Sequence, residues 1–181
     1  IHSEMPTQDS AGLHGFQLWV NLPAAEKLAA PRYRDIEGAA LPRLSGEGFE
    51  AALLAGDWRL GSATGSGALE ELTPQAALAD LTLAPGAAVT VASEAGENLV
   101  AYLYAGALAG IGPGGVSRGH LLVAAGDGDW TVEAGAAGAG LLVLRGRPLR
   151  EPVVHYGPFV MNTREEIERA LAEYRDGTFL G

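Results

Sequence analysis

The chain has 181 residues, of which 22 are Asp or Glu and 12 are Lys or Arg, giving a formal net charge of -10. This excess of negative charge would repel a phosphate backbone, so direct nucleic-acid binding is not expected. There is no cysteine, which excludes disulfides and thiolate metal sites. No apolar run reaches the roughly 18 residues of a membrane span, and the sequence opens without a signal peptide, so a cytoplasmic protein is predicted.

The composition favours a folded β protein. Hydrophobic residues make up 48% of the chain, and its 26 glycines and 10 prolines are spread through the whole sequence. This combination suits short strands joined by many turns and does not suit disorder. A chain of this length buries about 70% of its unfolded surface, which is enough for one sizeable core or for a core plus a fragment of another.

The first residues include two potential metal ligands, His2 and Glu4. In an extended strand, residues two apart point to the same face, so this imidazole and this carboxylate can converge on one ion. Pro6 then ends the strand, because proline cannot donate to a sheet ladder. The alternative is a solvated terminus without any ligand role, and the His-x-Glu spacing alone does not decide between the two.

Residues 14–21 are rich in apolar and aromatic side chains, which predicts a second strand after a polar loop. His14 in this stretch could be a third ligand, a proton shuttle near the metal, or a histidine that only makes structural hydrogen bonds close to the site. We favour the last role, because most buried polar groups in proteins simply satisfy hydrogen bonds. Pro23 then begins a short helical turn, which Pro31 ends.

From about residue 38 to residue 146 the sequence offers short β-like runs separated by glycine or proline, which is the pattern of an all-β sandwich or barrel. Runs as short as these favour a jelly roll. The predicted strands are 49–54, 77–83, 88–92, 99–104, 121–125, 130–133 and 141–144. Turns are expected at 85–86, 96, 105–106, 126–128 and 135–140, and a flexible loop is expected at 61–67.

The placement of histidine argues against a metal site in this barrel. Such a site needs clustered imidazoles, but no histidine falls within 86–106 or within 127–145, and His120 stands alone. Glu94 and Glu97 are interpreted as part of a solvated acidic loop. The barrel is therefore predicted to be non-catalytic, with His120 in a structural role.

The end of the chain combines an extended segment with a helix. Residues 151–163 are apolar with a glycine-proline break, which predicts an extended segment lying against hydrophobic surface, with His155 making a structural hydrogen bond. Thr163 and Glu166 have the spacing of a capping box, and apolar residues at helical spacing follow. Gly177 is the expected stop. The sequence therefore predicts an amphipathic C-terminal helix that docks on its own protein.

Two stretches closely resemble the pirin family, and they occur in the family's order and separation. They are HSEMPTQDSAGLHGFQLWVNLP, with APRYRDI following, and GRPLREPVVHYGPFVMNTREEIERALAEYRDGTF. The resemblance implies a bicupin, which is two jelly-roll β-barrels in tandem. It also implies one non-haem iron, held in the first barrel by three histidines and one glutamate. His2 and Glu4 match the third histidine and the glutamate.

The other two histidines of the family lie in an upstream His-Pro-His-Arg-Gly motif, which is absent from this sequence. The chain therefore resembles the C-terminal part of a pirin, cut inside the first barrel. The expected domains are a remnant of the N-terminal cupin barrel with half of its metal site (1–37), a complete C-terminal cupin barrel without metal (38–150), and an extended segment with an amphipathic helix (151–181). Because such a remnant exposes unpaired strand edges, its expected partner is the missing half or a swapped copy of the chain.

The function implied by the resemblance is an iron(II) dioxygenase that opens the ring of a flavonol such as quercetin. Imidazoles and one carboxylate that leave open positions on the metal suit oxygen activation. His2 would be a neutral ligand, and Glu4 would be an anionic ligand that also accepts the substrate hydroxyl proton. One alternative is an iron-dependent regulatory bicupin that binds a protein without turnover. Another is an inert structural fragment.

Overall fold

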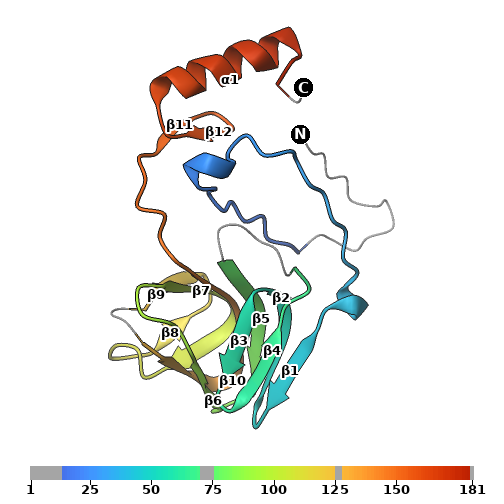
Figure 1. Cartoon of the computed structure of the whole chain (residues 1–181). Helices are drawn as coiled ribbons and strands as arrows, with labels where there is room; N and C mark the ends of the chain where they lie inside the picture. Colours follow the sequence, from blue (N-terminus) through green and yellow to red (C-terminus); the bar gives the residue numbers. More distant parts are fainter. Residues whose placement is uncertain (1–13, 70–75, 125–127, 180–181) are drawn as a thin grey trace.

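The computed structural model describes residues 14–69, 76–124 and 128–179, and it shows a β-barrel with a small helical unit beside it (Figure 1). Strands β1 to β10 belong to one ten-stranded sheet that curves into a nearly closed barrel. The predicted jelly roll with one C-terminal α-helix is thereby confirmed. None of the helices in the described ranges combines the length and the apolar composition that crossing a membrane requires.

Neighbouring strands of the barrel pair antiparallel, in the order β1-β2-β5-β10-β6-β3-β4, with β7 paired to β10, β8 and β9. A separate hairpin, β11-β12, precedes the helix α1. The elements are η1 (Ala24–Glu26), η2 (Gly38–Ala40), β1 (Arg43–Gly46), β2 (Phe49–Ala55), β3 (Asp57–Leu60), β4 (Ala63–Ser66), β5 (Ala76–Leu83), β6 (Ala88–Val91), β7 (Asn98–Ala109), β8 (Val116–Ser117), β9 (His120–Val123), β10 (Trp130–Gly146), β11 (Val154–Tyr156), β12 (Phe159–Met161) and α1 (Arg164–Asp176).

The inside of the barrel is filled by apolar side chains that alternate along the strands. In β5, Ala77, Ala79, Leu81 and Leu83 are buried, while the residues between them face outward. This follows from the two-residue period of a strand. The buried residues of the described ranges include no polar or charged side chain. The barrel interior is therefore a hydrophobic core.

Strand β10 holds the barrel together, because it pairs with β6 and β7 in its first half and with β5 and β7 in its second half. The turns predicted at 105–106 and 135–140 are wrong, since both stretches lie within continuous strands. They mark a register shift between β7 and β10, where Gly106 and Gly138 both have positive φ. A Cβ at Gly106 would collide with the Gly138 carbonyl. Glycine in a strand signals a bulge as readily as a turn. Here Gly106 and Gly138 lie where the paired strands β7 and β10 bend.

Two other local predictions differ from the structure. The loop expected at 61–67 is largely the β3-β4 hairpin, in which Leu60 pairs with Ala63 across a two-residue turn. Residues 14–21 contain no assigned strand, although a strand was predicted there from their apolar composition. A strand is assigned only where a ladder forms, and no described strand pairs with this segment.

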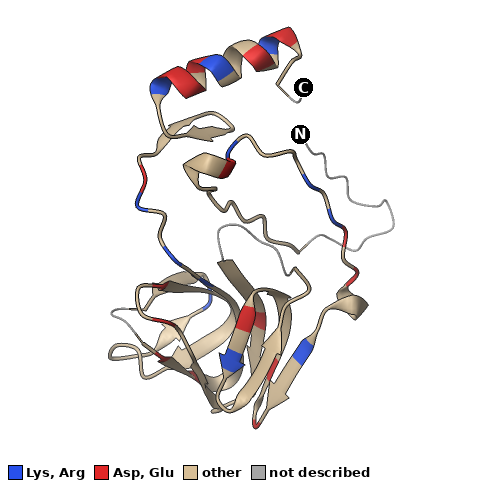
Figure 2. Cartoon of the chain, in the orientation of Figure 1, with Lys and Arg blue, Asp and Glu red and all other residues tan. Residues whose placement is uncertain are grey.

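The helical unit has its own small core, separate from that of the barrel, formed by Phe159, Met161, Ile167 and Ala170. Figure 2 shows residues of both charge signs along the rest of α1, as expected of an amphipathic helix. The predicted capping box is present: the Thr163 side chain accepts a hydrogen bond from the Glu166 backbone, and the Glu166 carboxylate accepts one from the Thr163 backbone. Gly177, in the left-handed conformation, is the C-cap, as expected.

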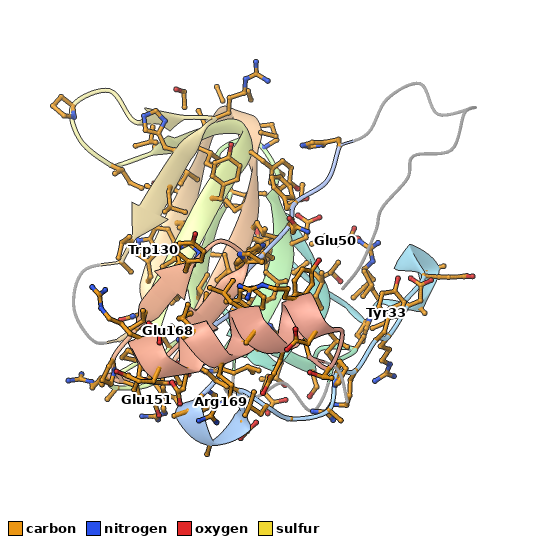
Figure 3. All side chains as sticks on the ribbon, turned by 90° about the horizontal axis from the view of Figure 1, so that it is seen from above. Tyr33, Glu50, Trp130, Glu151, Glu168 and Arg169 are labelled. Carbon is orange, nitrogen blue, oxygen red and sulfur yellow. The ribbon has the colours of Figure 1, made fainter. Side chains whose placement is uncertain are left out.

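One side chain, Glu151, joins this unit to the N-terminal segment. Its carboxylate accepts hydrogen bonds from the Ala24 backbone N–H at 2.8 Å and from the Asn162 side chain at 3.2 Å. Figure 3 shows Glu151 close to η1 and below α1. Residues 14–29 are thus tied to the C-terminal unit by a contact that spans most of the chain.

Replacing a central core residue of β10 is expected to destabilise the barrel strongly. Leu141 is fully buried, so Leu141→Ala should lower the free energy of unfolding by about 3 kcal/mol through lost burial and a cavity. The matched control is Leu121→Ala, because Leu121 on β9 is 63% exposed and should cost less than about 0.5 kcal/mol. Urea unfolding of both variants is the measurement. Equal costs would contradict this description of the core.

The start of α1 is expected to be sensitive to acid. Backbone N–H groups of Asn162 and Thr163 donate to the Glu166 carboxylate and lower its pKa below the ordinary 4.5. A lowered folded-state pKa means that this contribution to stability is present above pH 4.5 and is lost as the pH falls through the folded-state value. The Thr163 amide resonance should report this titration in NMR. Glu166→Gln should abolish the titration, whereas Glu165→Gln should leave it; its persistence in Glu166→Gln would refute the assignment.

Candidate functional site

The two predicted metal ligands, His2 and Glu4, lie outside the described residues, so their role stays a prediction. Within the described ranges, no three His, Cys, Asp or Glu side chains gather closely enough to hold a metal ion. The apolar barrel interior offers no ligand either. The residues that the structure describes therefore do not fit a metal site by themselves.

His14 lies on the outside of the barrel, against the aromatic side chains of β7. Its ring is 5.4 Å from that of Phe16 and 6.0 Å from that of Tyr104, both edge to face. Phe16 in turn contacts the rings of Tyr102 and Tyr104 at 5.7 and 5.6 Å. Such aromatic pairs typically contribute about 0.5–1.5 kcal/mol each. The first described residues are thus packed on the barrel's outer face, where His14 makes aromatic contacts, and its predicted place near the metal stays a prediction.

Tyr104 makes a short hydrogen bond that the sequence did not suggest. Its hydroxyl donates to the Asp80 carboxylate at 2.6 Å, from β7 across β10 to β5. Burial, followed by the hydrogen bond and the negative charge of Asp80, raises the pKa of Tyr104 to about 12. No sequence signal marks this pair, because the two residues are 24 positions apart and on non-adjacent strands.

The ring of Tyr104 rests on a residue without a side chain. A Cβ added to Gly140 on β10 would lie 2.7 Å from two ring atoms of Tyr104. Only glycine lets the phenol lie flat over the sheet and reach Asp80. The Tyr104–Asp80 pair therefore depends on a close approach between side chain and backbone.

A second polar cluster lies where β10 ends. Arg145 makes an ion pair with Glu97 at 3.2 Å, and the two side chains are only 13% and 10% exposed. Arg145 also donates to the Asp57 carbonyl oxygen and stacks over the Trp58 ring at 5.4 Å. The interpretation of Glu97 as a solvated acidic residue is wrong, because the fold brings Arg145 onto it. This arrangement places a paired charge at that end of the barrel.

Of the two other described histidines, only His120 has a hydrogen-bond contact, and the structural role predicted for His155 stays a prediction. His120 is exposed on β9, and its Nδ1 is 2.8 Å from the Ser117 carbonyl oxygen. His155 is exposed on β11. Neither belongs to a cluster of metal-ligating side chains in the described part of the chain.

The environment of Tyr104 predicts its ionisation. Because the folded-state pKa is raised to about 12, any stabilisation from this group is present below pH 10 and is lost as the pH rises through 12. The difference between the ultraviolet titrations of the parent protein and Tyr104→Phe should therefore show one phenol ionising near pH 12. Asp80→Asn should lower that midpoint, since it removes the acceptor charge. A midpoint close to pH 10 in the parent protein would contradict the described geometry.

Comparisons with known proteins connect this fold to one family. The pirin C-terminal cupin domain matches residues 78–180, more than half of the chain. "Putative quercetin 2,3-dioxygenase PA3240" of Pseudomonas aeruginosa is 44% identical over 180 residues, covering 98% of this chain and 63% of its own. Pirin of Homo sapiens is 33% identical over 181 residues, covering 97% of this chain and 60% of its own.

A solved structure is also similar to this chain. The crystal structure of quercetin 2,3-dioxygenase from Acinetobacter baumannii matches with a TM-score of 0.77 and 27% identity, over 89% of this chain and 55% of that one. The chain thus spans about 60% of the length of its relatives. The jelly-roll barrel is a cupin barrel, and the chain belongs to the pirin family.

Proposed function

We propose that the chain forms part of a pirin-type quercetin 2,3-dioxygenase, acting with the segment that its longer relatives carry in addition. The observation that carries this proposal is the 44% identity over 180 residues to a Pseudomonas aeruginosa protein named for that activity. The structural similarity to quercetin 2,3-dioxygenase from Acinetobacter baumannii supports it. This chain spans only 63% of the length of the Pseudomonas aeruginosa protein. The activity is therefore proposed for the whole protein and not for this chain alone.

His2 and Glu4 are the proposed metal ligands of this chain, with Glu4 also the proposed proton acceptor. An imidazole and a carboxylate are ligand types that suit a non-haem iron. Their same-face spacing in a strand is the physical reason to group them. No three metal-ligating side chains gather within the described ranges, so we place the remaining ligands on the segment that the longer relatives carry in addition.

Metal content tests the ligand assignment without depending on turnover. The chain is co-expressed with a family segment that carries the His-Pro-His-Arg-Gly motif, and iron is measured by elemental analysis. About one iron per complex is expected, falling to less than about a tenth in His2→Ala or Glu4→Ala, because removing a ligand costs more than the 10–100-fold typical of outer-shell changes. His120→Ala is the matched control and should retain iron. Iron that is unaffected by His2→Ala and Glu4→Ala would overturn the assignment.

The activity is tested on the same complex by following quercetin loss together with carbon monoxide release. Turnover that requires iron and is lost in Glu4→Ala would support the dioxygenase. Stoichiometric iron without turnover would overturn it and favour the iron-dependent regulatory alternative.

A further inference from the structure

Strand β9 lies at an edge of the barrel, and one of its two sides is unpaired. Among the described strands, β9 pairs only with β7, and Figure 1 shows it at the outer edge of the barrel. The unpaired side of an edge strand presents a row of backbone N–H and C=O groups. A further extended strand can add to such a row through main-chain hydrogen bonds.

The pairing with β7 determines which backbone groups face the free side of β9. The Ala124 N–H donates to the Leu99 carbonyl oxygen at 3.0 Å, which continues the register of the two strands. In an antiparallel ladder, successive residues alternate between bonding to the partner and facing away from it. The backbone groups of Leu122 therefore face β7, whereas those of Leu121 and Val123 face the free side.

The same two residues carry exposed apolar side chains. Leu121 is 63% exposed and Val123 is 68% exposed. Their direct partners on β7 are Tyr102 and Val100, so the four side chains form one apolar row on the outer face of the barrel. Edge strands that stay unpaired are commonly protected by lysine or proline, but β9 reads His-Leu-Leu-Val and contains neither.

A second copy of β9 matches this edge in both register and charge. When two copies run antiparallel with their Leu122 residues opposite each other, Leu121 of one copy faces Val123 of the other. Each of these two pairs exchanges two backbone hydrogen bonds, so the contact is two-fold symmetric and satisfies the free groups on both edges. β9 carries no acidic side chain, so the negative charge of the chain does not oppose this contact directly.

We propose that β9 is the contact of a two-fold dimer, in which the sheets of two barrels join across paired β9 strands. Leu121 and Val123 of both copies then lie side by side and are removed from water. Two strands of four residues form a smaller contact than the roughly 1,200 Å² of stable interfaces, so a weak dimer that depends on concentration is expected.

This dimer is independent of the proposed dioxygenase function, because the contact needs no metal and includes neither His2 nor Glu4. It also differs from the swapped copy expected for the N-terminal remnant, since it uses the barrel and no residue of 1–37.

Sedimentation equilibrium of the full chain, from about 10 μM to about 1 mM, tests the association. We expect the average mass to rise with concentration toward twice that of one chain. Added salt should strengthen the association, because each copy carries a formal net charge of -10 and salt screens the repulsion between them. A mass that stays at one chain throughout, or a dimer that salt weakens, would overturn the proposal.

A matched pair of variants locates the contact. Val123→Lys should weaken the association at least about tenfold, because it brings a positive charge from each copy into the paired edge. Val153→Lys is the control: Val153 is 61% exposed and lies outside the barrel, so the same charge change should leave the association as it is. Association that survives Val123→Lys, or that both variants weaken equally, would refute the site.

Amide hydrogen exchange, followed by NMR, tests the hydrogen bonds themselves. Raising the protein concentration should slow the exchange of the Leu121 and Val123 amides, which face the free side. The Leu122 amide should exchange equally at low and high concentration, since it is already paired with β7 in the single chain. Dimer formation without slower exchange at Leu121 and Val123 would show that the copies meet elsewhere and would contradict the proposal.

Discussion

The rest of the structure depends on the bend in β10. This 17-residue strand pairs with three others. At its bend, β10 and β7 can approach each other closely only because Gly106 and Gly138 have no side chains and adopt positive φ. The bend lets β5, β6 and β7 share one strand, which closes the sheet around a core with no buried polar residue in the described ranges. Since each fully buried leucine contributes roughly 1.5–3 kcal/mol, closing the barrel is also what stabilises it.

Because apolar side chains fill the inside of the barrel, its polar side chains lie on the outer surface and at the ends. Arg145 and Glu97 form a largely buried ion pair at one end of the barrel, which is costly to break because the remaining charge would be left unpaired. On the outer face, Tyr104 reaches Asp80 over Gly140. The same side carries the aromatic contacts of residues 14–16, so the first described residues pack on this face.

The C-terminal unit helps to position that segment. Its core of Phe159, Met161, Ile167 and Ala170 is independent of the barrel core, and Glu151 connects it to Ala24 at the start of η1. Residues 14–29 are thus held at two places. Aromatic packing joins them to β7, and the Glu151 carboxylate joins them to the C-terminal unit. The contact between Ala24 and Glu151 thus connects residues that lie 127 positions apart in the chain.

The sequence by itself determined the features that rest on local spacing. Alternating apolar residues identified β5 and β6, the Thr163–Glu166 spacing identified the capping box, and two motifs identified the pirin family. Only the tertiary structure decided which glycines bend strands instead of ending them, because a turn and a bulge share the same local signal. It also decided the pairs Tyr104–Asp80, Arg145–Glu97 and Ala24–Glu151, which are 24, 48 and 127 residues apart. The first two pairs meet through the folding of the barrel, and the third through the packing of the N-terminal segment beside the C-terminal unit, and no local pattern encodes these contacts.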